Sequence, residues 1–226
     1  MTRTLLLLAC FSSAAFAQEE REPRPSVTDE VEPVRLRGGI TAGIGSFAPG
    51  PNLMFGLSGT LGWQLSRTFG LEGEFSMAAG VGLNAGFNRD GASAGVTGAA
   101  YYQLALLADF IAFDHLFVDV GPALAHGGWA GAVASVKMND ASAQGQVYGV
   151  GGWLPGAAAK IGYLAGGRNP VTGQRRGFSI SLDVNLLFGD RLAAVATASG
   201  NGTSARTNFG TGVGFGAMLN LGYAWQ

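Results

Sequence analysis

This chain has little charge, few lysines and a single cysteine, and each shortage excludes a class of protein. The cysteine, Cys10, lies near the N-terminus, so the rest of the chain has no disulfide framework and no thiolate metal ligands. Charged residues make up 13% of the 226 residues, and the net charge is −1 with Lys137 and Lys160 as the only lysines. No cationic stripe is present, which excludes nucleic acid as a partner. Beyond residue 17, no apolar run is long enough for a transmembrane helix.

The N-terminal residues divide into two segments with different compositions. Residues 1–17 combine Arg3, an apolar stretch and the sequence Ala-Phe-Ala, which predicts a cleaved secretory signal peptide. A lipoprotein cleavage site at Cys10 is the alternative interpretation. Residues 18–33 are rich in glutamate and proline, which predicts a disordered periplasmic linker. Residues 34–226 then form the folded domain.

The last segment of the chain alternates strictly between apolar and small or weakly polar residues. Its apolar positions are Val213, Phe215, Ala217, Leu219, Leu221, Tyr223 and Trp225. A period of two indicates a β-strand. Its length matches the roughly 9–11 residues of a membrane-spanning strand better than the 5–6 of an ordinary one. The aromatic end is typical of an interfacial girdle.

The same alternation runs through most of the folded domain. It predicts strands over 34–47, 53–65, 69–83, 96–112, 116–126, 147–164 and 177–189, in addition to the terminal one. Short turns at 66–68 and 113–115 alternate with long segments at 84–95, 127–146 and 190–207, which we interpret as outer loops. Pro122 removes a ladder hydrogen bond in mid-strand and predicts a local bulge. The expected fold is all-β, an eight-stranded antiparallel up-and-down transmembrane β-barrel.

The signal peptide, the alternating strands and the terminal pattern Leu219, Leu221, Tyr223 and Trp225 resemble the small eight-stranded outer-membrane barrels of Gram-negative bacteria, of the outer membrane protein A and X type. The terminal pattern departs from the family in one respect, because Gln226 follows the last aromatic residue. The resemblance implies the cell outer membrane as the location. It implies outer-membrane lipid, lipopolysaccharide and the barrel-assembly machinery as partners, and a monomer. No cofactor is expected.

Strand parity places the charged residues of the predicted strands inside the barrel. The inward positions carry Arg35, Arg37, Glu72, Glu74, Asp109, Asp119, Lys160 and Asp183. An eight-stranded barrel is only wide enough to be filled by side chains, so we expect these groups to interlock as a network of salt bridges that plugs the lumen. A proton or ion path is the alternative. Small residues at Gly43, Gly45, Gly56, Ser58 and Thr60 predict a small cavity in the outer part of the lumen.

The candidate catalytic and metal-binding residues are sparse. Glu72 and Glu74 are paired carboxylates, but they point into a narrow lumen without an accessible sugar cleft. An enzyme of this architecture would use a histidine with a nearby serine, and His126 with Ser135 is the nearest match. His115 lies in a predicted turn, and two separated histidines give no metal-ligand spacing. We therefore expect no catalytic, cofactor or metal site.

These observations favour a plugged outer-membrane barrel with a structural or surface-interaction role carried by its outer loops. The first alternative is a narrow channel for ions or small solutes. The less favoured alternatives are a lipid A-modifying enzyme and a soluble periplasmic ligand-binding barrel whose apolar face points inward.

Overall fold

The structure is a computed structural model, and it describes residues 34–89, 91–113, 115–137, 142–166, 175–199 and 202–225. The predicted signal peptide and linker, residues 1–33, lie outside the described residues. The described chain is all-β, and no helix in it has the length and apolar character needed to cross a bilayer.

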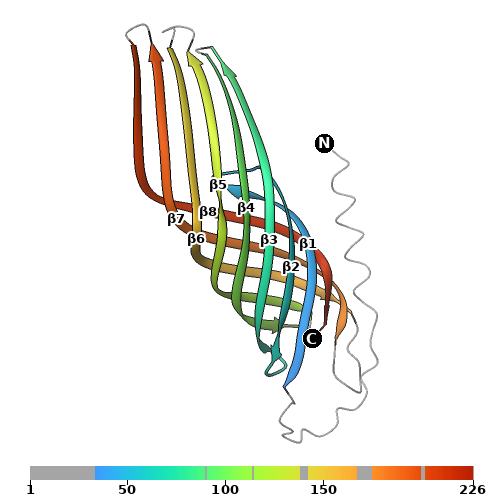
Figure 1. The fold of residues 1–226 in the computed structure, drawn as a ribbon. Coiled ribbons are helices and arrows are strands. Elements are labelled where there is room, and N and C mark those ends of the chain that lie inside the picture. The colour runs from blue at the N-terminus through green and yellow to red at the C-terminus, as the bar shows by residue number, and fades with distance from the viewer. Residues whose placement is uncertain are drawn as a thin grey trace, which may run out of the picture. The chain divides into compact units, whose positions relative to one another are not determined.

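Eight antiparallel strands follow one another around a closed ring, in which each strand pairs with its neighbours in sequence and β8 pairs with β1 (Figure 1). The predicted up-and-down barrel is therefore confirmed. The strands are β1 (Arg35–Ala48), β2 (Leu53–Gln64), β3 (Phe69–Asn88), β4 (Gly91–Ala112), β5 (Leu116–Lys137), β6 (Ser142–Ala165), β7 (Arg176–Ser199) and β8 (Gly202–Trp225).

The alternation in the sequence separates the two faces of the ring. Large apolar side chains point outward, and Ile40 and Leu106 are 67% and 61% exposed. The adjacent Leu107 points inward and is 1% exposed. Because successive side chains in a strand point to opposite faces, one parity of residues makes the outer surface of the barrel and the other fills the lumen.

The β1–β2 hairpin is much shorter than the other strand pairs. Its last register pairs are Ala48 with Phe215 and Leu53 with Val81. Beyond these pairs, β3 to β8 continue as one curved, open sheet (Figure 1), in which β3 pairs only with β4 and β8 only with β7. We call this part the sheet extension, which comprises the described residues of 82–99, 128–151 and 189–214.

The sheet extension corrects our interpretation of 84–95, 127–146 and 190–207 as outer loops. Most of these residues are strand. Their Gly, Ala, Ser and Asn content has low β propensity, but that propensity depends on context and is overridden by ladders such as those of β7 and β8.

The tight turns are confirmed, but the bulge at Pro122 is not. The backbone N–H of Leu65 donates to Phe69 O at 3.0 Å, which closes the first turn. On both sides of Pro122 the β4–β5 ladder keeps one register, so the proline interrupts pairing without shifting it. The irregularity lies in β6, between Val150 and Gly156.

Candidate functional site

The lumen near the short turns holds a buried ion cluster. The guanidinium of Arg37 pairs with the Glu72 carboxylate at 3.0 Å, and it also donates to Asp109. All three side chains are nearly inaccessible to solvent. They come from β1, β3 and β4, so this cluster ties together strands on one side of the ring.

A second buried cation lies across the ring from the first. The Lys160 ammonium on β6 pairs with Glu74 on β3. In register, Lys160 is opposite Asp119 of β5 on one side and Asp183 of β7 on the other. Asp183 also accepts a hydrogen bond of 2.7 Å from the hydroxyl of Ser181. A charge in this position interacts strongly with its neighbours because the interior screens poorly.

Asp119 has the fewest hydrogen-bond partners of these buried charged residues. It lies directly opposite Asp109 in the β4–β5 ladder, and neither of its carboxylate oxygens has a hydrogen-bond partner among the described residues. A cavity of about 30 Å³ adjoins it and is also lined by Arg37, Glu72 and Lys160. That volume is sufficient for a water molecule, which needs roughly 10–15 Å³ by this measure.

Arg35 differs from the other predicted lumen charges. It is only half-buried at the start of β1, and it takes part in no ion pair among the described residues. The remaining predicted residues, which are Arg37, Glu72, Glu74, Asp109, Asp119, Lys160 and Asp183, are all buried in the lumen.

Above the charges, the lumen is packed with neutral side chains. The Gln103 amide donates to Asn185 Oδ1 at 2.9 Å. Closer to the sheet extension, the ring of Phe47 lies 4.9 Å from that of Trp129 and 5.8 Å from that of Tyr101, measured between centroids. These aromatic side chains and their apolar neighbours form a buried cluster that closes this end of the lumen.

The predicted small cavity in the outer lumen is present beside Gly56 and Ser58, but its volume is only about 20 Å³. That is enough for a water molecule and too small for a larger ligand. A side chain at Gly43 would meet the Asn220 amide, and one at Gly56 would meet the Met218 side chain. Residues of β8 fill most of the space beside Gly43, Gly45 and Gly56, and the Ser58 hydroxyl bonds to that of Thr41 at 2.7 Å. Larger residues at these glycine positions would overlap the Asn220 and Met218 side chains of β8. Thr60 lines the cavity of about 30 Å³ that adjoins the buried charges.

The terminal pattern is mostly on the outer surface. Leu219, Leu221 and Tyr223 are all exposed on the outer face of β8. Trp225 is half-buried, and its indole ring covers Gly38 of β1, where a Cβ would come within 2.6 Å of the ring.

The structure does not bring His126 and Ser135 together. Both lie on β5, but nine positions apart and of opposite parity, so they face opposite sides of the sheet. His126 instead packs between Tyr102 and Trp153, with ring centroids at 5.3 and 4.8 Å. His115 lies at the turn end, 3.1 Å from the carbonyl of Leu164. In the part of the chain that the structure describes, no His, Cys, Asp and Glu side chains are grouped for a metal ion.

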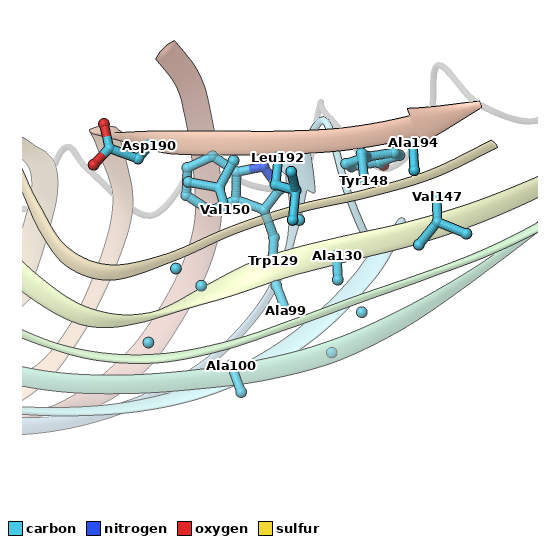
Figure 2. A pocket seen from close by; sticks show the side chains of 16 residues that line it. Ala99, Ala100, Trp129, Ala130, Val147, Tyr148, Val150, Asp190, Leu192 and Ala194 are labelled. Carbon is cyan, nitrogen blue, oxygen red and sulfur yellow. The ribbon is translucent and has the colours of Figure 1, made fainter. Parts of the chain in front are cut away.

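One feature that the sequence did not predict is a hollow of about 960 Å³ on the outer face, at the base of the sheet extension (Figure 2). Its lining comes from β3 to β7 and is almost entirely apolar. The sequence feature that could have predicted the hollow is a decrease in residue size at the outward positions. On β4, for example, Leu106, Leu104 and Tyr102 give way to Ala100 and Gly98.

Comparisons with known proteins add no family to these findings. No protein-family model matches the chain, and neither a curated protein nor a solved structure matches it significantly.

Proposed function

We propose that this protein is a small outer-membrane β-barrel with a plugged lumen, which presents its sheet extension to the cell exterior for a structural or surface-interaction role. The observation that carries the proposal is the distribution of polarity around the ring. Large apolar side chains cover the outside, while ion pairs fill the inside. In water this arrangement would expose a broad apolar surface and bury charge. A bilayer requires the apolar outer face, and charge inside the ring avoids the cost of charge facing lipid.

Aromatic side chains support the membrane interpretation by marking two levels on the outer surface. Phe110 and Tyr163 lie toward the short turns, and Tyr102 and Trp153 lie toward the sheet extension. Aromatic girdles at both interfaces are typical of transmembrane barrels. The outward apolar face also argues against a soluble ligand-binding barrel, whose apolar face would line the interior.

The packed lumen favours a closed barrel over a channel. Two cavities that the described residues enclose in the lumen have volumes of about 30 and 20 Å³, and the aromatic cluster of Phe47, Tyr101 and Trp129 closes the end that faces the sheet extension. The proposed location and partners are those of an outer-membrane barrel, namely outer-membrane lipid, lipopolysaccharide and the barrel-assembly machinery. The separation of His126 from Ser135 gives no support to a lipid A-modifying activity.

Cysteine labelling of whole cells tests this proposal. The chain after the predicted signal peptide has no cysteine, so any label on the protein must be on the single cysteine that is introduced. A membrane-impermeant maleimide should label Ser204→Cys in the sheet extension of intact cells, and it should label Thr68→Cys in the short turn only after lysis. Labelling of Thr68→Cys in intact cells, or protection of Ser204→Cys, would contradict the proposed orientation.

A further inference from the structure

The hollow on the outer face is built from the smallest residues of the sheet. Its floor consists of Gly98, Ala100, Gly128, Ala130, Gly149 and Gly151, which come from three neighbouring strands and are paired in register. Val147 and Leu192 line it from β6 and β7, and they are 58% and 49% exposed. Figure 2 shows the side chains that line it.

A bend in the sheet accounts for the position of the hollow. Gly127 of β5 and Gly152 of β6 have φ of 134° and 104°, a region that residues with a Cβ rarely adopt. The register shift in β6 between Val150 and Gly156 lies beside them. Bulges bend a strand and increase its local twist, so the strands change direction at this level.

No side chain of the described chain fills the floor of the hollow. A Cβ built on Gly98 would find its nearest neighbour, Gly80 O, at 3.8 Å, and one on Gly149 would find Ala130 Cβ at 3.9 Å. Both distances are ordinary contacts. Gly98 and Gly149 are therefore not required by packing within the chain, and larger side chains there would project into the hollow. Gly128 is required, because a Cβ there would lie 2.0 Å from Val150 O.

The surroundings of the hollow identify the chemistry that fits it. On one side it borders the outer aromatic level at Tyr102, His126 and Trp153, and through it the apolar exterior of the ring. The one charged side chain in its lining is Asp190, which is exposed and has no ion pair among the described residues. Its neighbour Arg191 has the opposite parity, with its guanidinium 5.5 Å from the centre of the Tyr148 ring.

We propose that this hollow binds an acyl chain of a membrane lipid whose polar end carries an ammonium group beside Asp190. The inference rests on the proposed function, because the surrounding bilayer supplies the lipid. The volume lies within the roughly 300–1,000 Å³ of small-ligand sites, which are mostly apolar with a few polar groups that fix orientation. The Asp190 carboxylate attracts an ammonium group and repels a lipid that offers only phosphate.

A second copy of the chain fits this surface poorly. A symmetric dimer would place the same hollow on both sides of its interface, and two concave surfaces leave a void between them. Asp190 lies at the end of the hollow nearer the ring, next to the Val150–Arg191 pair, and a flexible acyl chain that starts there can follow the small-residue floor toward the Val147–Ala194 pair.

Photocrosslinking of the purified barrel tests the inference. The probe is lysophosphatidylethanolamine with a diazirine in its acyl chain, added to protein in maltoside micelles. We expect saturable adducts on 147–151 or 190–194. Gly149→Leu should lower their yield about tenfold by filling the hollow. The matched control is Gly145→Leu, on the same strand and face but outside the hollow, where a Cβ meets nothing within 4 Å. It should leave the yield unchanged.

A second variant tests the polar end of the ligand. Asp190→Asn should weaken labelling by the ethanolamine probe but not by the matching lysophosphatidylglycerol probe, which lacks the ammonium group. Equal effects on both probes would overturn the assignment of the ammonium group to Asp190. Adducts spread evenly over the barrel exterior and insensitive to Gly149→Leu would overturn the lipid site.

Crosslinking in cells distinguishes a bound lipid from another protein or a second copy of the chain. With benzoylphenylalanine in place of Leu192, a crosslink to another protein or to a second copy would overturn the lipid site, whereas a lipid adduct would support it. Membrane fractionation of the same samples tests the proposed outer-membrane location independently of the lipid site. A protein that resides in the outer membrane without a saturable adduct refutes only the lipid site, and one absent from the outer membrane refutes the proposed function as well.

Discussion

Replacing Lys160 by methionine should destabilise the barrel more than almost any other single change of charge. Lys160 is 6% exposed and pairs with Glu74, which is equally buried, and it lies in register between Asp119 and Asp183. Methionine fills a similar volume but leaves these carboxylates without their nearest cation. Removing one partner of a buried pair costs about 3–5 kcal/mol, which corresponds to roughly a hundred- to several-thousandfold in the unfolding equilibrium.

The assay is urea unfolding of the barrel in lipid vesicles, followed by tryptophan fluorescence and by the mobility of the folded form on a gel. Arg206→Met is the matched control, because it makes the same kind of change at an exposed cation of the sheet extension. Its free energy of unfolding should change by no more than about 0.5 kcal/mol.

A double variant separates the charge from the volume. Adding Glu74→Gln to Lys160→Met removes one uncompensated carboxylate, so it should recover part of the lost stability, with a coupling energy on the order of 0.5–3 kcal/mol. If Lys160→Met behaves like Arg206→Met, the lumen charges do not stabilise the ring and the reasoning is refuted.

Two further substitutions test the packing of the lumen and the solvent around the ring. Gly214→Val would place its Cβ against the rings of Phe47 and Trp129, so it should cost about 1–3 kcal/mol in vesicle unfolding, whereas Gly73→Val, whose Cβ has no neighbour closer than 3.7 Å, should be nearly neutral. Equal effects of the two variants would contradict the packed plug. Leu106→Arg, near the middle of the outer apolar surface, should cost about 2–4 kcal/mol in a bilayer. A change below about 0.5 kcal/mol, as is usual at a water-exposed site, would contradict the membrane environment.

The strands of the ring can be predicted from the sequence because the alternation of apolar and polar residues is a property of each strand by itself. Alternation places Leu104 outside and Asp109 inside whatever the neighbouring strands are, since the period of two follows from strand geometry alone. The strand order then follows from short connections such as 66–68, because antiparallel neighbours need only a tight turn.

The strands of the sheet extension were not predicted because the hydrophobic alternation of their residues is weak. Apart from Trp129, segments such as 127–146 carry mostly small or polar side chains on both faces, so hydrophobic periodicity does not distinguish a strand from a loop. The pairing of these residues depends on the neighbouring strands, which a single segment does not encode.

The side-chain contacts inside the lumen could not be predicted from the sequence either. Parity places Asp109 and Asp119 inside, but it does not reveal that they lie opposite each other or that Arg37 pairs with the first of them. Likewise, the size of the side chains on nearby strands decides whether a glycine such as Gly56 opens a cavity or makes room for Met218. The hollow depends on a bend whose direction is a property of the whole sheet.

Heat modifiability in isolated outer membranes tests most directly whether this ring is a membrane barrel. The sample is compared on an SDS gel with and without boiling. We predict that the protein fractionates with the outer membrane and that the unboiled form migrates faster, because a closed barrel in which β8 pairs with β1 resists unfolding by SDS at room temperature. A single band at the unfolded position, with the protein released by osmotic shock, would contradict the proposed membrane barrel.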